Sequence, residues 1–200
     1  MFPFLFSIGF YGQANSRAQQ KVLMRGNAKD PANLNAPDYI KWLDSESQLL
    51  TALVQYINQI DHDIIIGWNI INFDFRVLAK RAQVNGVSLK LGRGAKAMRW
   101  RDSYTDTNQG FVSLAGRMVI DGIAALKAEA YSFPSFSLQA MAEHFLGKGK
   151  LSQDVDNRLE HIVHDFNHNK PKLAAYNLQD CILVWDIFAK ARLLDFLIFR

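Results

Sequence analysis

The chain has 200 residues, of which 49% are hydrophobic and 21% are charged. This composition excludes a disordered or low-complexity chain and predicts a globular domain with one sizeable core. The longest apolar runs, such as residues 64–68, fall far short of the roughly 18 residues that a bilayer span requires, so we expect no membrane partner. The single cysteine, Cys181, excludes an internal disulfide and fits a reducing compartment.

Positive charge is concentrated in one segment. The chain carries 23 basic and 19 acidic residues, a net of +4. Between Phe75 and Arg101 there is no acidic residue, and the basic ones are Arg76, Lys80, Arg81, Lys90, Arg93, Lys96, Arg99 and Arg101. The rest of the chain therefore has a net charge of −4. Such a segment is typical of polyanion binding, although a solvated loop would have the same composition.

Periodicity and capping signals in the first half predict two strands, then a helix, a strand and a helix, at residues 5–13, 19–24, 45–61, 63–68 and 73–84. The turn between the first two strands would pass through Gly12, Asn15 and Ser16, and residues 25–40 would form a loop. Ser45 and Gln48 predict a capping box. The β-branched run at 63–68 predicts a strand buried on both faces.

The second half predicts, after a basic loop, one or two strands broken at Gly116 and then four helices, at residues 111–120, 122–130, 137–146, 156–168 and 171–192. Asp121 would cap the first of these helices, and Pro171 suits the first turn of the last. The whole pattern predicts a single domain, residues 1–200, built on a mixed α/β sheet. The apolar character of both ends predicts a piece of a longer polypeptide.

A first group of polar residues lies where the 63–68 strand gives way to a helix. Asn69 and Asp74 fall at the carboxyl end of this strand, the edge at which α/β sheets bind ligands. By itself, Asp74 in a first helical turn is equally typical of an acid that complements the helix dipole.

A second group is Tyr176 with Asp180 on the last predicted helix. A spacing of four residues places the phenol and the carboxylate on one face, one turn apart. Taken alone, the pair would equally suit a tyrosine at the edge of the core with a solvated aspartate.

Together, these groups and the order of elements resemble the 3′–5′ exonuclease domain of family B DNA polymerases, in particular the bacterial DNA polymerase II branch. The likeness extends over residues 63–69, 116–122, 135–138 and 172–181, and covers the chain from about Ser7 onward. It implies a ribonuclease-H-like fold. The family's second motif, Asn-x-x-x-(Phe/Tyr)-Asp, matches Asn69, Phe73 and Asp74, and its third, Tyr-x-x-x-Asp, matches Tyr176 and Asp180.

The resemblance implies a role for each matched residue. Asp74 and Asp180 would bind divalent metal, and Tyr176 would orient the attacking water. Asn69 and Phe73 would contact the terminal nucleotides of a single-stranded DNA 3′ end. Carboxylates suit Mg²⁺ or Mn²⁺, and two such ions can activate water and stabilise the leaving oxygen.

The chain departs from the family at its first motif, Asp-x-Glu on the first strand. The first acidic residue is Asp30, and the only similar letters, Asp44-Ser-Glu46, precede a helix rather than lie on that strand. The resemblance therefore implies a fragment of a longer polymerase that starts downstream of this motif. We expect a gap in the sheet where that strand would lie, and a metal site without its shared ligands.

Weaker signals have simpler interpretations. His161, His164 and His168 share one helix face at a spacing that can chelate zinc, but a solvated polar face is the more common outcome. Asp121 resembles a catalytic acid but is better explained as a helix cap, and Cys181 as a packing residue.

The functional prediction is a proofreading exonuclease domain of the bacterial cytoplasm, impaired by the absent motif and partnered by the remaining polymerase domains. Its basic residues would hold the DNA backbone, with aromatic help from Phe73 and Trp100; the predicted contacts are Arg93, Lys96, Arg99 and Arg101. The alternative is a non-catalytic module that binds single-stranded nucleic acid or packs on the polymerase. A separate nuclease would need an unexpected carboxylate beside Asp74 and Asp180.

Overall fold

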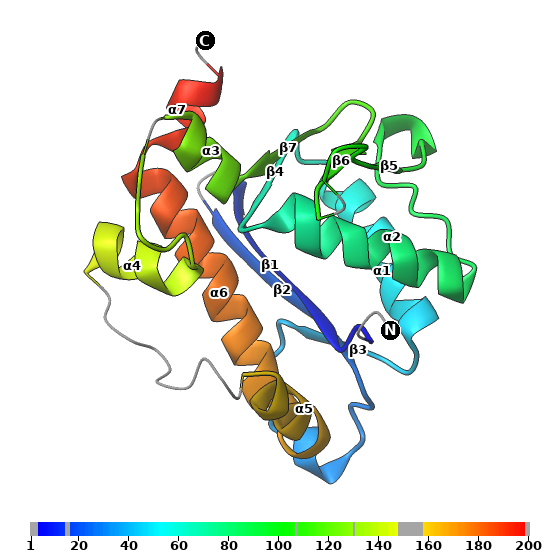
Figure 1. Ribbon diagram of the computed structural model, residues 1–200. Helices are drawn as coiled ribbons and strands as arrows, with labels where there is room; N and C mark the ends of the chain where they lie inside the picture. The colour runs from blue at the N-terminus through cyan, green and yellow to red at the C-terminus, as the bar shows by residue number, and fades with distance from the viewer. Residues whose placement is uncertain (1–3, 15–16, 107, 130, 148–157, 199–200) are drawn as a thin grey trace. The chain divides into compact units, whose positions relative to one another are not determined.

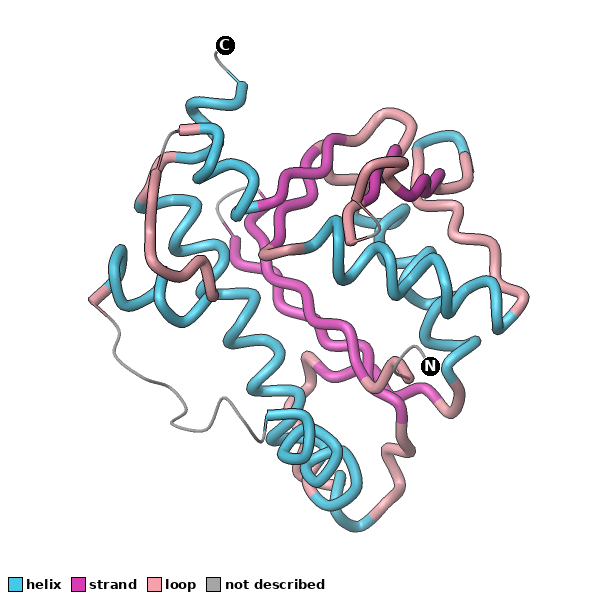
Figure 2. Tube along the Cα trace, viewed as in Figure 1, coloured by secondary structure: helices cyan, strands magenta, loops and turns pink. Residues whose placement is uncertain are grey.

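The computed structural model describes residues 4–14, 17–106, 108–129, 131–147 and 158–198. Its contacts divide the chain into two compact units. Unit 1 contains the residues up to Leu5 and Ser45–Tyr131, and unit 2 contains Phe6–Asp44 and Ser132–Arg200. The described strands form three separate sheets, one in unit 2 and two in unit 1 (Figure 2).

Unit 2 is built on a three-stranded sheet in the order β1-β2-β3. Its strands are β1 (Ser7–Ala14), β2 (Arg17–Arg25) and β3 (Ile40–Leu43). β1 and β2 are antiparallel over their whole length, and β3 runs parallel to the second half of β2. A short 3₁₀ turn, Pro31–Asn33, lies between β2 and β3.

The described helices of unit 2 are α4 (Leu138–Leu146), α5 (Arg158–His168), α6 (Lys170–Lys190) and α7 (Leu193–Ile198). The long helix α6 lies along the β1–β2 hairpin, and the other three helices contact it (Figure 1). Apolar residues of β2, β3 and α6 form the buried core between them: Val22, Met24, Ile40, Leu173, Ala174 and Leu178. Burial of these side chains is the main force that fixes α6 on the sheet.

In its described residues, unit 1 contains three α-helices and four short strands. In chain order they are α1 (Glu46–Ile60), β4 (Ile64–Gly67), α2 (Arg76–Asn85), β5 (Arg99–Asp102), β6 (Gly110–Ser113), β7 (Met118–Asp121) and α3 (Gly122–Ala128). β4 and β7 pair in parallel, and β5 and β6 form an antiparallel hairpin. The buried faces of α1 and α2 supply much of the core: Leu49, Leu50, Leu53, Val77, Leu78 and Ala82.

A buried ion pair joins α1 to α2. Glu46 in the first turn of α1 receives hydrogen bonds from the Arg81 guanidinium and from the amide of Leu5. Burial alone would raise the pKa of Glu46, but the bonds from Arg81 and Leu5 lower it overall. Because removing one partner would leave the other charge buried and unpaired, the pair fixes how the two helices meet. Glu46 is thus already paired with Arg81 within unit 1.

Most of the predicted elements are present, but the structure corrects several details. β3 and β5 were not expected, because each has four residues and two of those in β5 are arginines. β4 is half-buried along its length rather than buried on both faces, since among the described strands it pairs with β7 alone. Gly12 lies within β1 opposite Gln19 instead of in the turn. The predicted turn residues 15–16 lie outside the described residues.

The mixed α/β architecture agrees with the predicted fold class. Within the described chain, no strand pairs with the second edge of β1 or with the second edge of β4. None of the helices in the described ranges is both long and apolar enough to cross a membrane.

Candidate functional site

The segment after β4 makes a sharp, irregular turn. A Cβ atom on Gly67 would lie 2.5–2.8 Å from side-chain atoms of Ile70, so glycine is needed for the chain to fold back this closely. Asn69 adopts the left-handed conformation, with φ 55° and ψ 25°, which asparagine tolerates better than most residues. Ile70–Phe75 then form a turn of π-helix that leads into α2. Residues 69–75 are called the motif turn below.

Two hydrogen bonds tie the motif turn to other strands of unit 1. The amide of Ile71 donates to Oδ2 of Asp121, at the end of β7, over 3.3 Å. The Asn72 Oδ1 atom accepts from the amide of Gly110, at the start of β6, over 3.0 Å. The other oxygen of Asp121 accepts from two amides at the start of α3, over 3.0 and 3.3 Å, which confirms the predicted helix cap.

The motif turn presents the three residues of the predicted second motif to solvent. Asn69, Phe73 and Asp74 are all exposed, and Phe73 retains 57% of its accessible surface although it is a large apolar side chain. The Asp74 carboxyl touches solvent, but the surrounding protein atoms exclude much of the nearby water and raise its pKa to about 7. The negative charge of Asp121 adds to this rise. A bound cation would favour the ionised form of Asp74.

The predicted third motif lies on α6 in unit 2. Tyr176 and Asp180 are both half-buried and one helical turn apart. Between them, Asn177 donates from Nδ2 to the Ser7 hydroxyl of β1 over 2.9 Å. The helix can approach the strand this closely because residue 9 is glycine: a Cβ there would lie 2.7 Å from the Asn177 side chain. The packing of α6 on β1 therefore sets the position of this pair within unit 2.

Several residues of the basic segment are bound within the protein. Arg81 pairs with Glu46, and Arg76 pairs with Asp102 across 3.6 Å. Arg93 donates to the carboxylates of Asp61 (3.0 Å) and Asp63 (2.7 Å) and to two backbone carbonyls. Arg93 therefore holds its own loop, and its contact with a DNA phosphate stays a prediction.

The β5–β6 hairpin carries two exposed cations of this segment, Arg99 and Arg101, together with aromatic rings. Arg101 lies with its guanidinium carbon 4.8 Å from the ring centre of Phe111 and 6.0 Å from that of Tyr104. Phe111 and Tyr104 are 54% and 93% exposed, and Arg99 and Lys96 are also exposed. These side chains form the hairpin platform: Lys96, Arg99, Arg101, Tyr104 and Phe111.

The aromatic residue that the sequence analysis named on this hairpin, Trp100, is less exposed than Phe111 and Tyr104. Trp100 is half-buried, packs over Gly110 and donates from its indole nitrogen to Asp102 (3.2 Å). Phe111 is paired with Arg101 in the strand register and lies exposed. The period-two alternation of β5 separates Trp100 from Arg101, but that strand was not predicted.

No described group of three or more His, Cys, Asp or Glu side chains is arranged to hold a metal ion. The three histidines of α5 are exposed, and the rings of His164 and His168 stack on each other with centres 4.5 Å apart. Parallel rings do not direct their nitrogen lone pairs toward a common point, which favours the solvated face over a zinc site.

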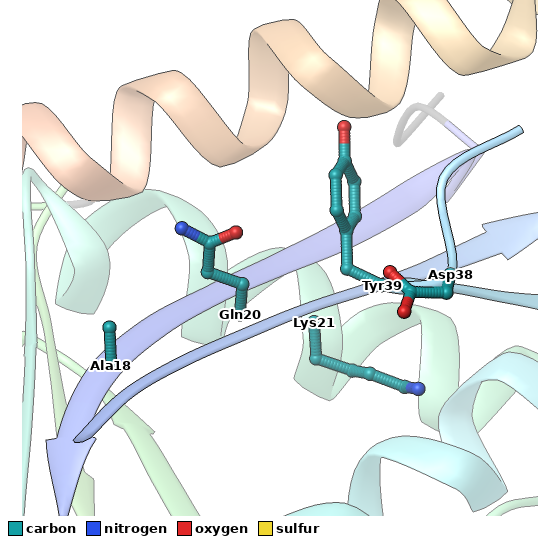
Figure 3. Close-up of a pocket in the computed structure, with 5 residues that line it drawn as sticks. All are labelled: Ala18, Gln20, Lys21, Asp38 and Tyr39. Carbon is teal, nitrogen blue, oxygen red and sulfur yellow. The ribbon is translucent and has the colours of Figure 1, made fainter.

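A shallow, open pocket of about 450 Å³ lies in unit 2. The residues that line it are distant in sequence from Tyr176 and Asp180, the predicted site residues of that unit. Its lining residues are Ala18, Gln20, Lys21, Asp38 and Tyr39. Gln20 and Lys21 extend to opposite sides of β2 (Figure 3), as neighbouring residues of a strand do. The pocket begins where β3 stops pairing with β2, because β3 covers only the Val22–Arg25 part of that strand. No predicted motif residue lines it.

The chain matches known proteins over much of its length. Residues 7–141 match the family described as DNA polymerase family B, exonuclease domain. The chain is 40% identical to DNA polymerase II of Escherichia coli over 161 residues, which is 80% of this chain and 21% of that protein. It is 34% identical to DNA polymerase 1 of Pyrococcus abyssi over 152 residues, and 33% identical to the DNA polymerase delta catalytic subunit of Oryza sativa over 150 residues.

The matched parts of these two relatives are 18% and 13% of their lengths, and 74% and 70% of this chain. The chain thus spans about a fifth or less of the polymerases it matches. The family match covers well over half of the chain and includes the whole motif turn. The chain therefore belongs to the exonuclease domains of family B DNA polymerases.

Proposed function

We propose that this chain is the proofreading 3′–5′ exonuclease domain of a bacterial DNA polymerase II-like enzyme, and that it hydrolyses the 3′-terminal phosphodiester of single-stranded DNA. The motif turn carries this proposal. It presents Asn69, Phe73 and Asp74 together to solvent, and hydrogen bonds from two strands of unit 1 hold its backbone. A rigid backbone of this kind is what a site needs to place its groups for reaction.

Asp74 and Asp180 would each serve as a ligand for divalent cations, Mg²⁺ or Mn²⁺. The donor chemistry fits, because carboxylate oxygens suit these hard cations and Asp74 is open to solvent and therefore to a hydrated ion. When bound, such ions activate water and stabilise the oxygen that leaves. Two aspartates supply few ligands for metal ions. Among the described residues, no further carboxylate joins Asp74 or Asp180 in a group of three or more that could hold a metal ion. We therefore propose that this chain by itself is a slow nuclease.

The remaining residues would bind and orient the substrate. Phe73 offers an exposed ring on which a terminal base can stack. The Tyr176 hydroxyl would orient the attacking water, one helical turn from Asp180. The hairpin platform would hold the single strand, its cations against phosphates and its rings against bases.

A non-catalytic role in binding single-stranded nucleic acid is the second candidate. It is favoured by one observation: the described carboxylates do not form a ligand cluster, whereas the hairpin platform combines exposed cations and rings. Such a module would bind oligonucleotides in a salt-dependent manner without cleaving them. In either case the partners would be a DNA strand and the other domains of a longer polymerase in the bacterial cytoplasm.

The test is release of 3′ nucleotides from a single-stranded DNA oligomer with Mg²⁺, with Mn²⁺ or with a chelator. The 200-residue chain is compared with Asp74→Ala, Asp180→Ala and, as a matched surface carboxylate, Asp38→Ala. We expect slow, metal-dependent release that either motif substitution reduces at least about a hundredfold, since each removes a metal ligand, and that the control leaves unchanged.

Oligonucleotide binding, measured in parallel at two salt concentrations, separates the two candidates. Salt-sensitive binding with no release under any metal condition supports the non-catalytic module and rejects the nuclease. Release that survives both motif substitutions also rejects the proposed site.

A further inference from the structure

We propose that Asp121 is a positioning residue of this site: through the amide of Ile71 it holds the motif turn in the conformation that presents Asp74. The inference rests on the proposed function. Asp121 itself would touch neither metal nor DNA. Its carboxylate oxygens already accept hydrogen bonds from backbone amides on two sides.

The cap on α3 does not by itself account for an aspartate at this position. A helix cap uses one side-chain oxygen, and asparagine or serine supplies it about as well as aspartate. Here Oδ1 serves both amides of α3, and Oδ2 is left to the motif turn. Asp121 is only 6% exposed, and a buried carboxylate is costly unless its oxygens are hydrogen-bonded. The hydrogen bond from the Ile71 amide to Oδ2 is called the tether below. It is the part of this arrangement that only a second acceptor oxygen can provide.

The motif turn has a backbone that needs such support. Asn69 is left-handed, and the following residues form a π-helical turn, a rare conformation that is often found at functional sites. The first amides of any helical segment lack partners within it. Phe73 finds one in the carbonyl of Asn69, 2.9 Å away, and Ile71 finds one in Asp121.

The position of Asp121 in the sheet explains how it reaches the turn. In the parallel β4–β7 pair, Asp121 is the register partner of Gly67, the last residue of β4. Its side chain is therefore beside the point at which the motif turn leaves the strand. Ile71 lies three residues before Asp74, so a shift of its amide would be transmitted along the turn to the carboxylate.

Asp121→Asn separates the tether from the cap. The variant keeps an oxygen for the two α3 amides, but an NH₂ group replaces Oδ2 and cannot accept from Ile71. We expect hydrogen exchange at the Ile71 amide to become roughly tenfold faster, while the melting temperature changes by only a few degrees. Because misplacement of a reacting group is costly, kcat for 3′ nucleotide release should fall about ten- to a hundredfold, with a smaller change in KM.

Ser45→Ala is the matched control within unit 1. It removes the hydroxyl that caps α1 and should lower stability without altering exchange at Ile71. Unchanged Ile71 exchange in Asp121→Asn would overturn the tether. Faster exchange with unchanged kcat would overturn the positioning role.

Failure of the proposed function would be seen separately. If the wild-type chain releases no nucleotide, broadening of the Asp74 amide resonance by Mn²⁺ takes the place of kcat, and we expect weaker broadening in Asp121→Asn. Equal broadening in both proteins would overturn the positioning role. A wild-type chain with neither release nor Mn²⁺ broadening would overturn the proposed metal site and the positioning role with it, while exchange at Ile71 would still decide the tether.

Discussion

The two motif-bearing regions place their side chains in opposite ways. In unit 1, Asp74 lies on an irregular turn with a left-handed residue at its start, and hydrogen bonds from β6 and β7 hold that turn. In unit 2, Tyr176 and Asp180 lie on the long regular helix α6, where the helical period alone fixes their spacing. The comparison shows that a regular helix needs only to be docked correctly, whereas an irregular turn must be held residue by residue.

Each region nevertheless depends on one glycine. Gly67 lets Ile70 fold back over the end of β4, and Gly9 lets α6 approach β1 beside Asn177 and Cys181. The obstacles differ in kind. At Gly67 the nearest atoms include the Cβ of Ile70, which is fixed to the backbone of the motif turn, whereas at Gly9 they are the ends of side chains.

The largest expected effect comes from Gly67→Ala. Its methyl group would lie 2.5–2.8 Å from Ile70, so the motif turn itself must move. We expect a loss of about 2–3 kcal/mol in the free energy of unfolding, together with loss of metal-dependent nucleotide release. Chemical denaturation and the release assay measure the two effects.

Gly9→Ala is the matched variant in the other region. Because side-chain ends can rotate away, we expect a smaller loss, about 1 kcal/mol, and partial retention of release. Equal losses for the two variants would contradict the contrast between a tethered turn and a docked helix.

This contrast also explains what the sequence could and could not predict. The Tyr176–Asp180 geometry follows from a spacing of four on a long apolar helix, and the structure has that helix. The motif turn was predicted only as the start of a helix at about residue 73, because no periodic pattern signals a π-helical turn at Ile70–Phe75. The Asp121 cap was predicted, but its bond to Ile71 was not, since the parallel β4–β7 pairing that brings them together is non-local.

The basic segment gives the same lesson at the level of charge. Its composition was correctly identified, but which arginines remain available depends on partners distant in sequence, such as Glu46 for Arg81 and Asp61 for Arg93. Charge counts cannot reveal such pairings. They require the tertiary structure.

A smaller effect is expected at Asn69, where backbone and side-chain roles can be separated. Asn69→Ala puts a residue with a Cβ but no side-chain amide into the left-handed conformation, at an expected cost of about 1 kcal/mol. Asn69→Gly restores the backbone preference but still lacks the amide. If Asn69 contacts the terminal nucleotide, both variants should show weaker oligonucleotide binding, whereas only Asn69→Ala should be less stable. Normal binding by Asn69→Gly would limit this residue to a backbone role.

The smallest expected effect concerns the charge of Asp74. Its folded pKa of about 7 lies above the value of about 3.9 for an unfolded aspartate. The protonated form therefore favours folding: this contribution is complete below about pH 4 and is lost as the pH rises through 7. Asp74→Asn cannot ionise, so it should be more stable than the wild type at pH 8, and by much less at pH 5. Because solvent reaches the carboxyl and screens it, we expect a gain of no more than about 1 kcal/mol.

Thermal unfolding at the two pH values, with and without Mg²⁺, tests this expectation, and Asp38→Asn reports the effect of removing one surface charge elsewhere. A cation bound at Asp74 should stabilise the wild type at pH 8 and not Asp74→Asn, since binding to the folded state adds to its stability. The advantage of Asp74→Asn at pH 8 should therefore shrink as Mg²⁺ is added. If Asp74→Asn is more stable than the wild type by the same amount at both pH values, ionisation of Asp74 carries no cost in the motif turn. The contrast with α6 would then rest on backbone geometry alone.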